Sequence, residues 1–422
     1  MARATRNVNN ISALRIHSGL VDTPFTGHLP EAPPTPHCRA GNHSPAEIRA
    51  GIELKGSYLR GWTRYYCSLE KVEQETTDML LKLDELSVIG EDVKELVHCA
   101  VFKPHVIDSL YRVYKIPKES GGFRTIEAPS KLLKIVQRAI LENVLYLSCK
   151  VSKQAMGFVP NRSILGNALR HCNFKRKLDN TDRWLWKMDM KDFFPSISAD
   201  KVFEGLIDTF DSFSTSSPVM LRKHMYITDY IPKLLGIMYL CTFKERLPQG
   251  SPTSPFLSNL VYAKVDARIT GMVSSSYRPG QAPVIYTRYA DDITMSSVDK
   301  ERLLQAIPLV NNLVEHTAGG VINWKKVSLC RHGRPMRVTG ININEGPSIS
   351  RTKRDNVRLM LHHTVKKGWV GYHEKAKLMG YRNFYRGVDR LGWDRRCEKD
   401  FLLMVDLPVR DDAPTNNDKG GH

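Results

Sequence analysis

The sequence predicts an α+β fold in which an antiparallel sheet carries helices on one face. Strand-forming residues concentrate at 183–190 and 284–297. Apolar residues spaced by three and four predict helices at 131–145, 202–210 and 299–316. The order strand, helix, hairpin, helix, strand favours one sheet with helices packed against it. A chain of 422 residues is long enough for two or three domains.

Charge and cysteine usage narrow the class of protein. The chain has 62 Lys and Arg against 44 Asp and Glu, a net charge of +18, which favours a polyanionic partner, nucleic acid before membrane. Its eight cysteines stand singly, which argues against a zinc ribbon and a disulfide framework. Without a membrane-spanning run or a hydrophobic signal core, the sequence predicts a reduced, cytoplasmic protein with no membrane partner.

The N-terminal part divides by composition. Residues 1–46 are rich in Pro, Asn, Ser and Thr and predict a flexible arm, whereas 47–100 predict a helical extension. A hairpin is expected to turn at Gly121 and Gly122. The helix at 131–145 should be amphipathic and basic on one face.

The middle of the chain should hold the sheet and its helices. The strand at 183–190 ends in the acidic stretch MDMKDFFPS, and Ser198 is expected to cap the next helix. Pro308 should disturb the helix at 299–316. Two short strands are then expected, around VINWKKVSLC and MRVTGININ.

The stretch 351–400 holds fourteen Lys and Arg against six acids, a net charge of +8. In one predicted helix, Arg354, Arg358 and Lys366 line a face away from the apolar one. Such a ridge is either solvated or follows the backbone of a duplex, and its charge density favours the duplex. From 409 to 422 a polar, disordered tail is expected.

Adjacent carboxylates, Asp291 and Asp292, occupy the tip of the hairpin at 284–297. The hairpin alone leaves two interpretations open, a solvated tip or a site that holds a cation. Asp189 ends the strand at 183–190, so one sheet can bring all three carboxylates together. Divalent ions bound through oxygens relieve their repulsion, and two such ions support in-line phosphoryl transfer. The sequence therefore predicts a polymerase or a nuclease.

Four ordered motifs resemble those of reverse transcriptases: FRTIEAPSKLLKIVQRAI, DMKDFFPSI, LPQGSPTSPFLSNL and YADD. The resemblance runs from about Val113 to Arg386 and implies a right-hand polymerase fold. The implied parts are fingers at 101–188, a palm at 189–345 with a helical insertion at about 205–245, and a helical, basic thumb at 346–408.

Two further elements, NALRH at 167–171 and RVTG at 337–340, resemble elements of retron reverse transcriptases. That resemblance implies that the RNA is read by Asn167, His171, Val338, Thr339 and Gly340. Each short element also has an ordinary structural interpretation, as a decorated helix face or a bulge.

The resemblance also implies roles at the active site. It assigns Asp189, Asp291 and Asp292, with the Met190 carbonyl, to two Mg²⁺ ions. It assigns contacts with the dNTP substrates, or with their leaving pyrophosphate, to Arg124, Asp192, Phe194, Gln249 and Lys326. For the lysine, Lys325 competes with Lys326, because the usual threonine after the motif lysine is missing.

The family resemblance implies a partner and a product. Retron enzymes bind their own structured non-coding RNA and extend DNA from the 2′-hydroxyl of an internal guanosine, which leaves a branched RNA–DNA product. They commonly act with an effector protein in antiphage defence. The alternatives are a group II intron or diversity-generating reverse transcriptase, and a non-catalytic RNA-binding protein. The role of the N-terminal 100 residues stays open.

Overall fold

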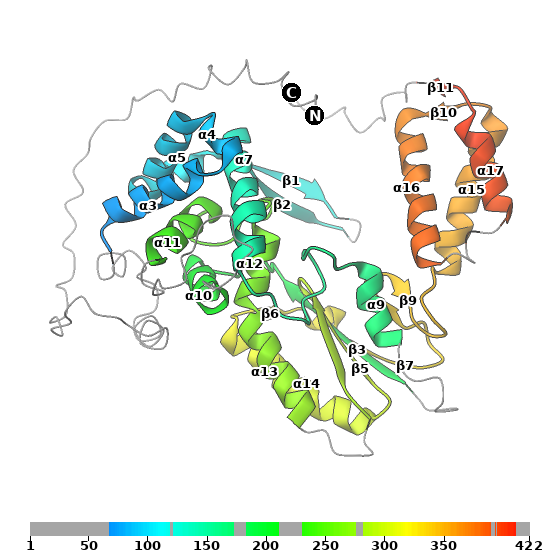
Figure 1. The fold of residues 1–422 in the computed structure, drawn as a ribbon. Coiled ribbons are helices and arrows are strands. Elements are labelled where there is room, and N and C mark those ends of the chain that lie inside the picture. Colours follow the sequence, from blue (N-terminus) through cyan, green and yellow to red (C-terminus); the bar gives the residue numbers. More distant parts are fainter. Residues whose placement is uncertain are drawn as a thin grey trace. The chain divides into compact units, whose positions relative to one another are not determined.

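The computed structural model describes residues 67–118, 121–172, 183–210, 230–275, 282–389, 393 and 395–410 (Figure 1). The predicted arm at 1–46 lies outside the described residues, as do the start of the helical extension, the segment 211–229 of the predicted insertion and residues 411–422. No helix within the described ranges has the length and apolar character needed to cross a bilayer.

Helices open the described part of the chain, as predicted for the extension. Ser68 caps the first of them by accepting a hydrogen bond from the Lys71 amide at 3.2 Å. This helix packs against α5 and α11. At its contact with α11, a Cβ on Gly236 would lie 1.9 Å from the Thr76 hydroxyl, so only glycine allows the approach. The helices are α3 (Leu69–Leu81), α4 (Asp84–Ser87), α5 (Gly90–Phe102) and α6 (Pro104–Ser109).

The predicted hairpin is confirmed as a two-stranded antiparallel ribbon. Gly121 and Gly122 turn it with φ of 84° and 80°, values that favour glycine. The helix that follows buries one face and exposes Lys131, Lys134 and Arg138 on the other, so its basic face is confirmed. The elements are β1 (Tyr111–Pro117), β2 (Phe123–Pro129), α7 (Lys131–Ile140), the π-helical η2 (Leu141–Leu145) and α8 (Tyr146–Ser148).

The central sheet is antiparallel throughout its described strands, in the order β4-β5-β3-β6, with β7 pairing the first half of β3. The strands are β3 (Trp184–Lys191), β4 (Ile285–Tyr289), β5 (Asp292–Ser297), β6 (Val321–Ile322) and β7 (Ser328–Arg331). The first short strand predicted after the hairpin is therefore two, separated by the 3₁₀ turn η4 (Trp324–Lys326).

Helices α13 (Ala263–Ser275) and α14 (Lys300–Thr317) pack on each other and cover one face of this sheet (Figure 1). Pro308 lies inside α14, which continues through it over 18 residues, so the predicted disturbance does not end the helix. The shorter α9 (Ile164–Cys172) contacts β4 from the opposite face. The sheet is thus fixed from both sides.

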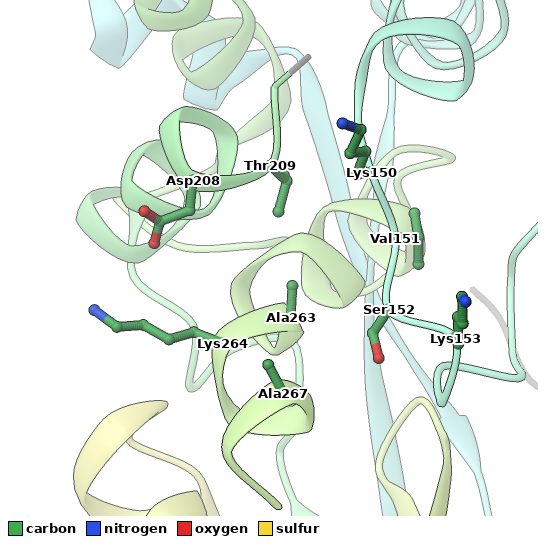
Figure 2. Close-up of a pocket in the computed structure, with 9 residues that line it drawn as sticks. All are labelled: Lys150, Val151, Ser152, Lys153, Asp208, Thr209, Ala263, Lys264 and Ala267. Atoms are coloured by element: carbon green, nitrogen blue, oxygen red, sulfur yellow. The ribbon is translucent and has the colours of Figure 1, made fainter. Parts of the chain in front are cut away.

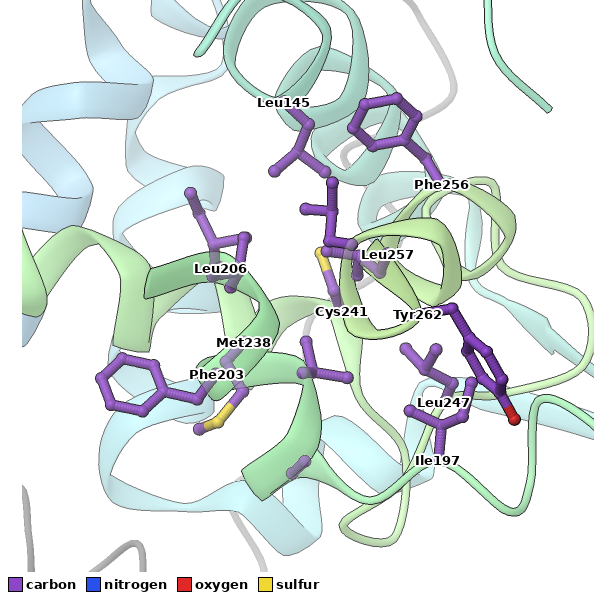
Figure 3. Packing of buried hydrophobic residues seen from close by; sticks show 14 of the residues in the cluster. Leu145, Ile197, Phe203, Leu206, Met238, Cys241, Leu247, Phe256, Leu257 and Tyr262 are labelled. Atoms are coloured by element: carbon purple, nitrogen blue, oxygen red, sulfur yellow. The ribbon is translucent and has the colours of Figure 1, made fainter. Parts of the chain in front are cut away.

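A second set of helices builds the core beside the sheet: α10 (Ala199–Thr209), α11 (Ile231–Cys241) and α12 (Ser254–Val261). Ser198 caps α10, as predicted, by accepting from the Lys201 amide at 3.4 Å. The apolar stripe of α10 is buried, and Figure 3 shows Phe203 and Leu206 among side chains of α11 and α12. This core supports the end of β3, where the acidic residues begin.

The C-terminal helices α15 (Arg351–Lys367), α16 (Tyr372–Val388) and α17 (Arg395–Val405) surround an apolar cluster of their own. The predicted second short strand is instead a tight hairpin of β8 (Arg337–Val338) and β9 (Ile341–Asn342). The start of the predicted tail is also corrected. Val409 and Arg410 form β11, which pairs with β10 (Val370–Gly371), so the described chain stays ordered to residue 410.

Candidate active site

The three predicted carboxylates meet at one end of the sheet. Asp189 on β3 stands directly opposite Asp292 on β5 in the antiparallel register. Asp291 occupies the turn between β4 and β5, next to Ala290, which has a left-handed φ of 53°. Because the side chains of directly opposite residues on neighbouring strands point to the same side, Asp189 and Asp292 share one face of the sheet. Figure 1 shows α13 and α14 on the other face.

Electrostatic repulsion is built into this arrangement. Burial, together with the negative charge of Asp189 and to a smaller extent that of Asp292, raises the pKa of Asp291 to about 6. Burial also raises the pKa of Asp292, although the Lys187 ammonium, 3.6 Å from its Oδ2, opposes that shift. Burial and mutual repulsion make it unfavourable to hold ionised carboxylates together, so this arrangement indicates a site that binds positive charge.

Part of that charge comes from η4. The Lys326 Nζ lies 2.9 Å from Asp189 Oδ2, and the Asn323 amide group donates to the same oxygen at 3.1 Å. The Asn323 backbone amide also donates to the Asp189 carbonyl at 2.8 Å. Lys325 has no contact of this kind among the described residues, so the geometry favours Lys326 over its rival. Asn323 and Lys187 were missed by the sequence analysis, because an ordinary Asn and a strand Lys carry no motif.

The donor set fits a partly hydrated divalent cation. No group of three or more His, Cys, Asp or Glu within the described ranges is already gathered as a metal cage. Magnesium does not require one, since it binds through a few carboxylates and keeps waters and substrate phosphates as other ligands. Such a cation would favour the ionised form of Asp291, whose pKa is raised first by burial and then by the charge of Asp189. Met190 is different, because its sulfur accepts from the Tyr262 hydroxyl at 3.2 Å, and only its backbone can serve.

The loop that contains Gln249 is anchored to the β1–β2 hairpin by Glu127. Arg246 donates to the Glu127 carboxylate through two nitrogens, at 3.0 and 2.6 Å. The Gln249 amide donates to the same carboxylate at 3.1 Å, and the Glu127 amide donates to the Gln249 carbonyl at 2.9 Å. A Cβ on Gly250 would lie 2.6 Å from the Glu127 carbonyl. Glu127 and Arg246 were missed, and the exposed Arg124 lies three residues before Glu127 on β2.

The residues after Asp189 form a turn rather than a continued strand. β3 ends at Lys191, and Asp192, which is exposed, has a φ of 43°. Phe193 and Phe194 therefore lie in this turn and not in the strand. Phe193 is 5% exposed and packs on Tyr262, with ring centroids 5.3 Å apart, whereas Phe194 is only half-buried.

Asn167 and His171 do not reach a surface that RNA could touch. His171 is fully buried, and its two ring nitrogens lie 2.7 Å from the Ser296 hydroxyl and 2.8 Å from that of Thr287. Burial and the nearby Arg170 lower the pKa of His171 to about 3, so it is neutral. Asn167 is 1% exposed, and its amide has no hydrogen-bond partner in the described chain. The prediction of direct RNA contacts is wrong for both residues, since both side chains are buried and His171 instead joins α9 to the sheet.

The second retron-like element packs against the first. Thr339 and Gly340 turn the β8–β9 hairpin with φ of 46° and 83°, and the Thr339 hydroxyl donates to the Ile164 carbonyl of α9 at 3.1 Å. Val338 is fully buried in a cluster with Ala168 of α9, so it too makes no direct contact with RNA. Gly340 is exposed. The two elements thus form one unit on the face of the sheet that also carries Asp189 and Asp292.

The three basic residues assigned to the thumb differ in their surroundings. Arg354 lies 3.8 Å from Asp389, a residue that is itself 9% exposed, so its guanidinium has an acidic partner within the chain. Arg358 pairs with the exposed Asp355 at 3.3 Å, a surface contact of little energy. Lys366 is exposed. The predicted contact with a nucleic-acid backbone stays a prediction for all three, and Arg354 differs from the other two in having a buried acidic partner.

A hollow of about 480 Å³ lies elsewhere, between the end of α10, the start of α13 and the segment after α8 (Figure 2). Its lining includes Ala263, Ala267 and Thr209, and Figure 2 shows Asp208 and Lys264 projecting from neighbouring helices. Asp189, Asp291 and Asp292 do not line it, so the hollow is separate from the carboxylate site.

Comparison with known proteins agrees with this geometry. Residues 116–343 match the family "Reverse transcriptase (RNA-dependent DNA polymerase)". The retron Mx65 reverse transcriptase of Myxococcus xanthus is 34% identical over 70% of this chain and 66% of its own length. The retron Ec86 enzyme of Escherichia coli is 32% identical over 71% of this chain and 85% of its own. The retron Ec73 enzyme of the same species is 30% identical over 65% and 82%. The chain therefore belongs to the retron reverse transcriptases, RNA-directed DNA polymerases with a right-hand fold.

Proposed function

We propose that this enzyme reverse transcribes its own structured non-coding RNA, starting from the 2′-hydroxyl of an internal guanosine. The product is a branched RNA–DNA molecule, multicopy single-stranded DNA. The observation that carries the proposal is the gathering of Asp189, Asp291 and Asp292 at one sheet edge, with Asp189 and Asp292 in register. The contact between α9 and the β8–β9 hairpin supports it, because it unites the two elements that distinguish retron enzymes.

The chemistry we propose is phosphoryl transfer with two Mg²⁺ ions, held by the three carboxylates and the Met190 carbonyl. When bound, the ions supply charge for the attacking and leaving oxygens. The priming hydroxyl loses its proton and forms a bond to the α-phosphorus of the dNTP, while the bond to pyrophosphate breaks. Lys326, already 2.9 Å from Asp189, gives the leaving pyrophosphate its proton.

Other residues of the site hold the substrate. Gln249, fixed to Glu127, contacts the nucleotide from the loop before α12. Arg124 on β2 binds the phosphates of the nucleotide. The exposed Asp192 lies near the ions that accompany these phosphates. Phe194, half-buried in the turn after β3, fills the space under the sugar where a ribonucleotide would need room for its 2′-hydroxyl.

The nature of the product tests the proposal. The enzyme is co-expressed with its RNA, and the DNA is isolated and treated with ribonuclease. DNA made as proposed keeps a guanosine joined through a 2′–5′ linkage, which a debranching enzyme removes. Asp291→Asn should bind the RNA and make no DNA, because it loses a cation ligand and keeps the basic surfaces. DNA that carries a free 5′ end would contradict the priming mechanism.

We further propose that the enzyme, its product and an effector protein act together in antiphage defence. A phage-plating assay with the complete gene cluster tests this step separately. Protection should disappear in the Asp291→Asn strain and in a strain that lacks the neighbouring effector gene. Protection that survives Asp291→Asn would show that DNA synthesis is not needed for it.

A further inference from the structure

A buried arginine lies under the catalytic turn, on the face of β4 that is turned away from the carboxylates. Arg288 is 0% exposed, and so is Asp266 of α13, its partner. The guanidinium donates to both Asp266 oxygens, from Nε at 3.0 Å and from Nη2 at 2.8 Å. The remaining nitrogen, Nη1, donates to the Asn259 side-chain oxygen at 3.0 Å and to the Ala290 carbonyl at 3.3 Å. This last contact reaches the turn itself.

A contribution to the stability of the fold does not by itself explain a buried Arg288–Asp266 ion pair. Removing two charges from water costs several kcal/mol for each ion, and apolar residues of similar volume are often as stabilising as a buried pair. Here the charges are fully hydrogen-bonded. The Tyr286 hydroxyl donates to Asp266 at 2.6 Å, and the Tyr262 ring centroid lies 4.9 Å from the guanidinium carbon. What the arrangement adds beyond burial is a rigid, planar set of donors aimed at fixed acceptors.

The acceptor at the turn is a strained residue. Ala290 has a φ of 53°, a left-handed conformation that costs a non-glycine residue roughly 1–2 kcal/mol. Such a conformation persists when its surroundings hold it, and strained residues of this kind gather at active sites. Arg288 holds the Ala290 carbonyl, and Ala290 comes directly before Asp291.

The same network holds the residue on the other side of Ala290. Asn259, which accepts from Arg288, donates to the Gly157 carbonyl at 2.8 Å. Gly157 lies against the Tyr289 ring, since a Cβ there would be 3.0 Å from it. The backbone of Arg288 is also fixed, because its carbonyl accepts from the Met156 amide at 2.7 Å. Arg288 and Tyr289, the two residues before Ala290, are therefore both tied to one network.

We infer that Arg288, oriented by Asp266 and Asn259, is a positioning residue that sets the catalytic turn and so the placement of Asp291 and Asp292. It touches no substrate. Its effect on the reaction comes through the Ala290 carbonyl, and a displacement of about 1 Å at a reacting group can lower a rate about 10²-fold.

The test compares two conservative substitutions at buried arginines. Arg288→Lys keeps a positive charge for Asp266, but a single ammonium cannot bridge Asp266, Asn259 and Ala290 together. Arg302→Lys is the matched control. Arg302 is 7% exposed and donates to the Ala282 and Val273 carbonyls at 2.6 and 3.0 Å, away from the turn. Each protein is assayed on a generic primer–template by single-turnover nucleotide insertion, with the concentration of active enzyme titrated.

Arg288→Lys should lower the insertion rate per active enzyme by about 10²-fold, with the KM for dNTP and the affinity for primer–template within about twofold of the parent. Arg302→Lys should keep the parental rate even if its melting temperature falls. A merely structural Arg288 would reduce the amount of active enzyme and leave the rate of each active molecule unchanged. A parental rate for Arg288→Lys, or an equal loss in both variants, overturns the inference.

Asn259→Leu decides the question if Arg288→Lys does not fold. It leaves the Arg288–Asp266 ion pair intact, removes one acceptor of Arg288 and releases Gly157. The rate per active enzyme should again fall with KM unchanged, by a smaller factor of about 10-fold, because the contact to Ala290 is kept. A rate equal to that of the parent overturns the inference.

Discussion

Lys326 and Asp189 are joined at the active end of β3, with the lysine Nζ 2.9 Å from one carboxylate oxygen, although the lysine side chain is 60% exposed. Because the Lys326 side chain is exposed, its ammonium can move from Asp189 to a substrate phosphate without disturbing the core. Lys325, next to it on η4, is exposed and makes no such contact in the described chain. The two lysines can therefore be separated by experiment.

Lys326→Ala should slow single-nucleotide insertion by about 10²- to 10⁴-fold, the range that a general acid contributes. Lys325→Ala should stay close to the parent, since its ammonium is not directed at the carboxylates. The pH profile of the insertion rate adds a second measurement, because loss of the acid removes its alkaline limb. Equal rates for the two variants would contradict the assignment.

The buried imidazole of His171 predicts a stability that depends on pH. Its pKa is lowered to about 3, below the value of an exposed histidine, so the unfolded chain takes up this proton first as the pH falls. The stabilisation is complete above about pH 6.5 and is lost as the pH falls toward 3, with a slope of about 1.4 kcal/mol per pH unit.

The measurement is denaturant unfolding of the parent and of His171→Gln at pH 7, 6, 5 and 4. Other titrating groups contribute to both proteins, so the difference between the two curves reports His171. That difference should be largest at pH 7 and shrink on acidification. Parallel curves would show that His171 is not held neutral by the fold.

Phe194 and Phe193 should separate sugar selection from stability. Phe194→Val opens the space under the sugar, so ribonucleotide insertion should approach the rate with deoxyribonucleotides. Phe193→Val should lower the free energy of unfolding, by less than the roughly 3–5 kcal/mol of a Phe→Ala change, because the ring packs on Tyr262. Insertion with matched dNTP and rNTP decides between them, and strong exclusion of rNTP by Phe194→Val would place the gate elsewhere.

The thumb arginines and lysine predict different effects on RNA binding. Lys366→Gln and Arg358→Gln should each flatten the log–log dependence of affinity on salt by up to about one unit, the slope lost with one phosphate contact. Arg354→Gln is the contrasting variant, because it should lower stability by removing the positive charge that faces the buried Asp389 and change the salt slope little. Identical slopes for all three proteins and the parent would mean that this face is only solvated.

The sequence was sufficient for the sheet, the capped helix after it and the meeting of three carboxylates. The alternation of apolar residues in strands and their spacing in helices indicate which side of an element is buried. Ser198 shows that a helix-capping residue can also be recognised from the sequence. The retron motifs were also read correctly as a family signal. Asn167, His171 and Val338 were misassigned as RNA contacts, because a motif does not reveal whether a side chain such as His171 points to solvent or into the sheet.

What the sequence could not provide were contacts between distant segments. Arg288 and Asp266 lie on a strand and a helix, and no local pattern indicates that their side chains meet. The same holds for Glu127 and Arg246, which join the β1–β2 hairpin to the loop before α12. The turn at Thr339 was read as strand because a positive φ is rare for threonine and is more often adopted by glycine or asparagine.

The hydrogen bond from Thr339 to the Ile164 carbonyl joins residues that are 175 positions apart in the sequence. Their two segments also pack in one apolar cluster with Leu185 of β3. The two segments are therefore expected to evolve together. A substitution on α9 changes the surface that receives the β8–β9 hairpin, so compensating changes should accumulate in pairs. Exchange between related enzymes should succeed when both segments come from the same parent, and crossovers that separate them should produce misfolded or inactive chimeras.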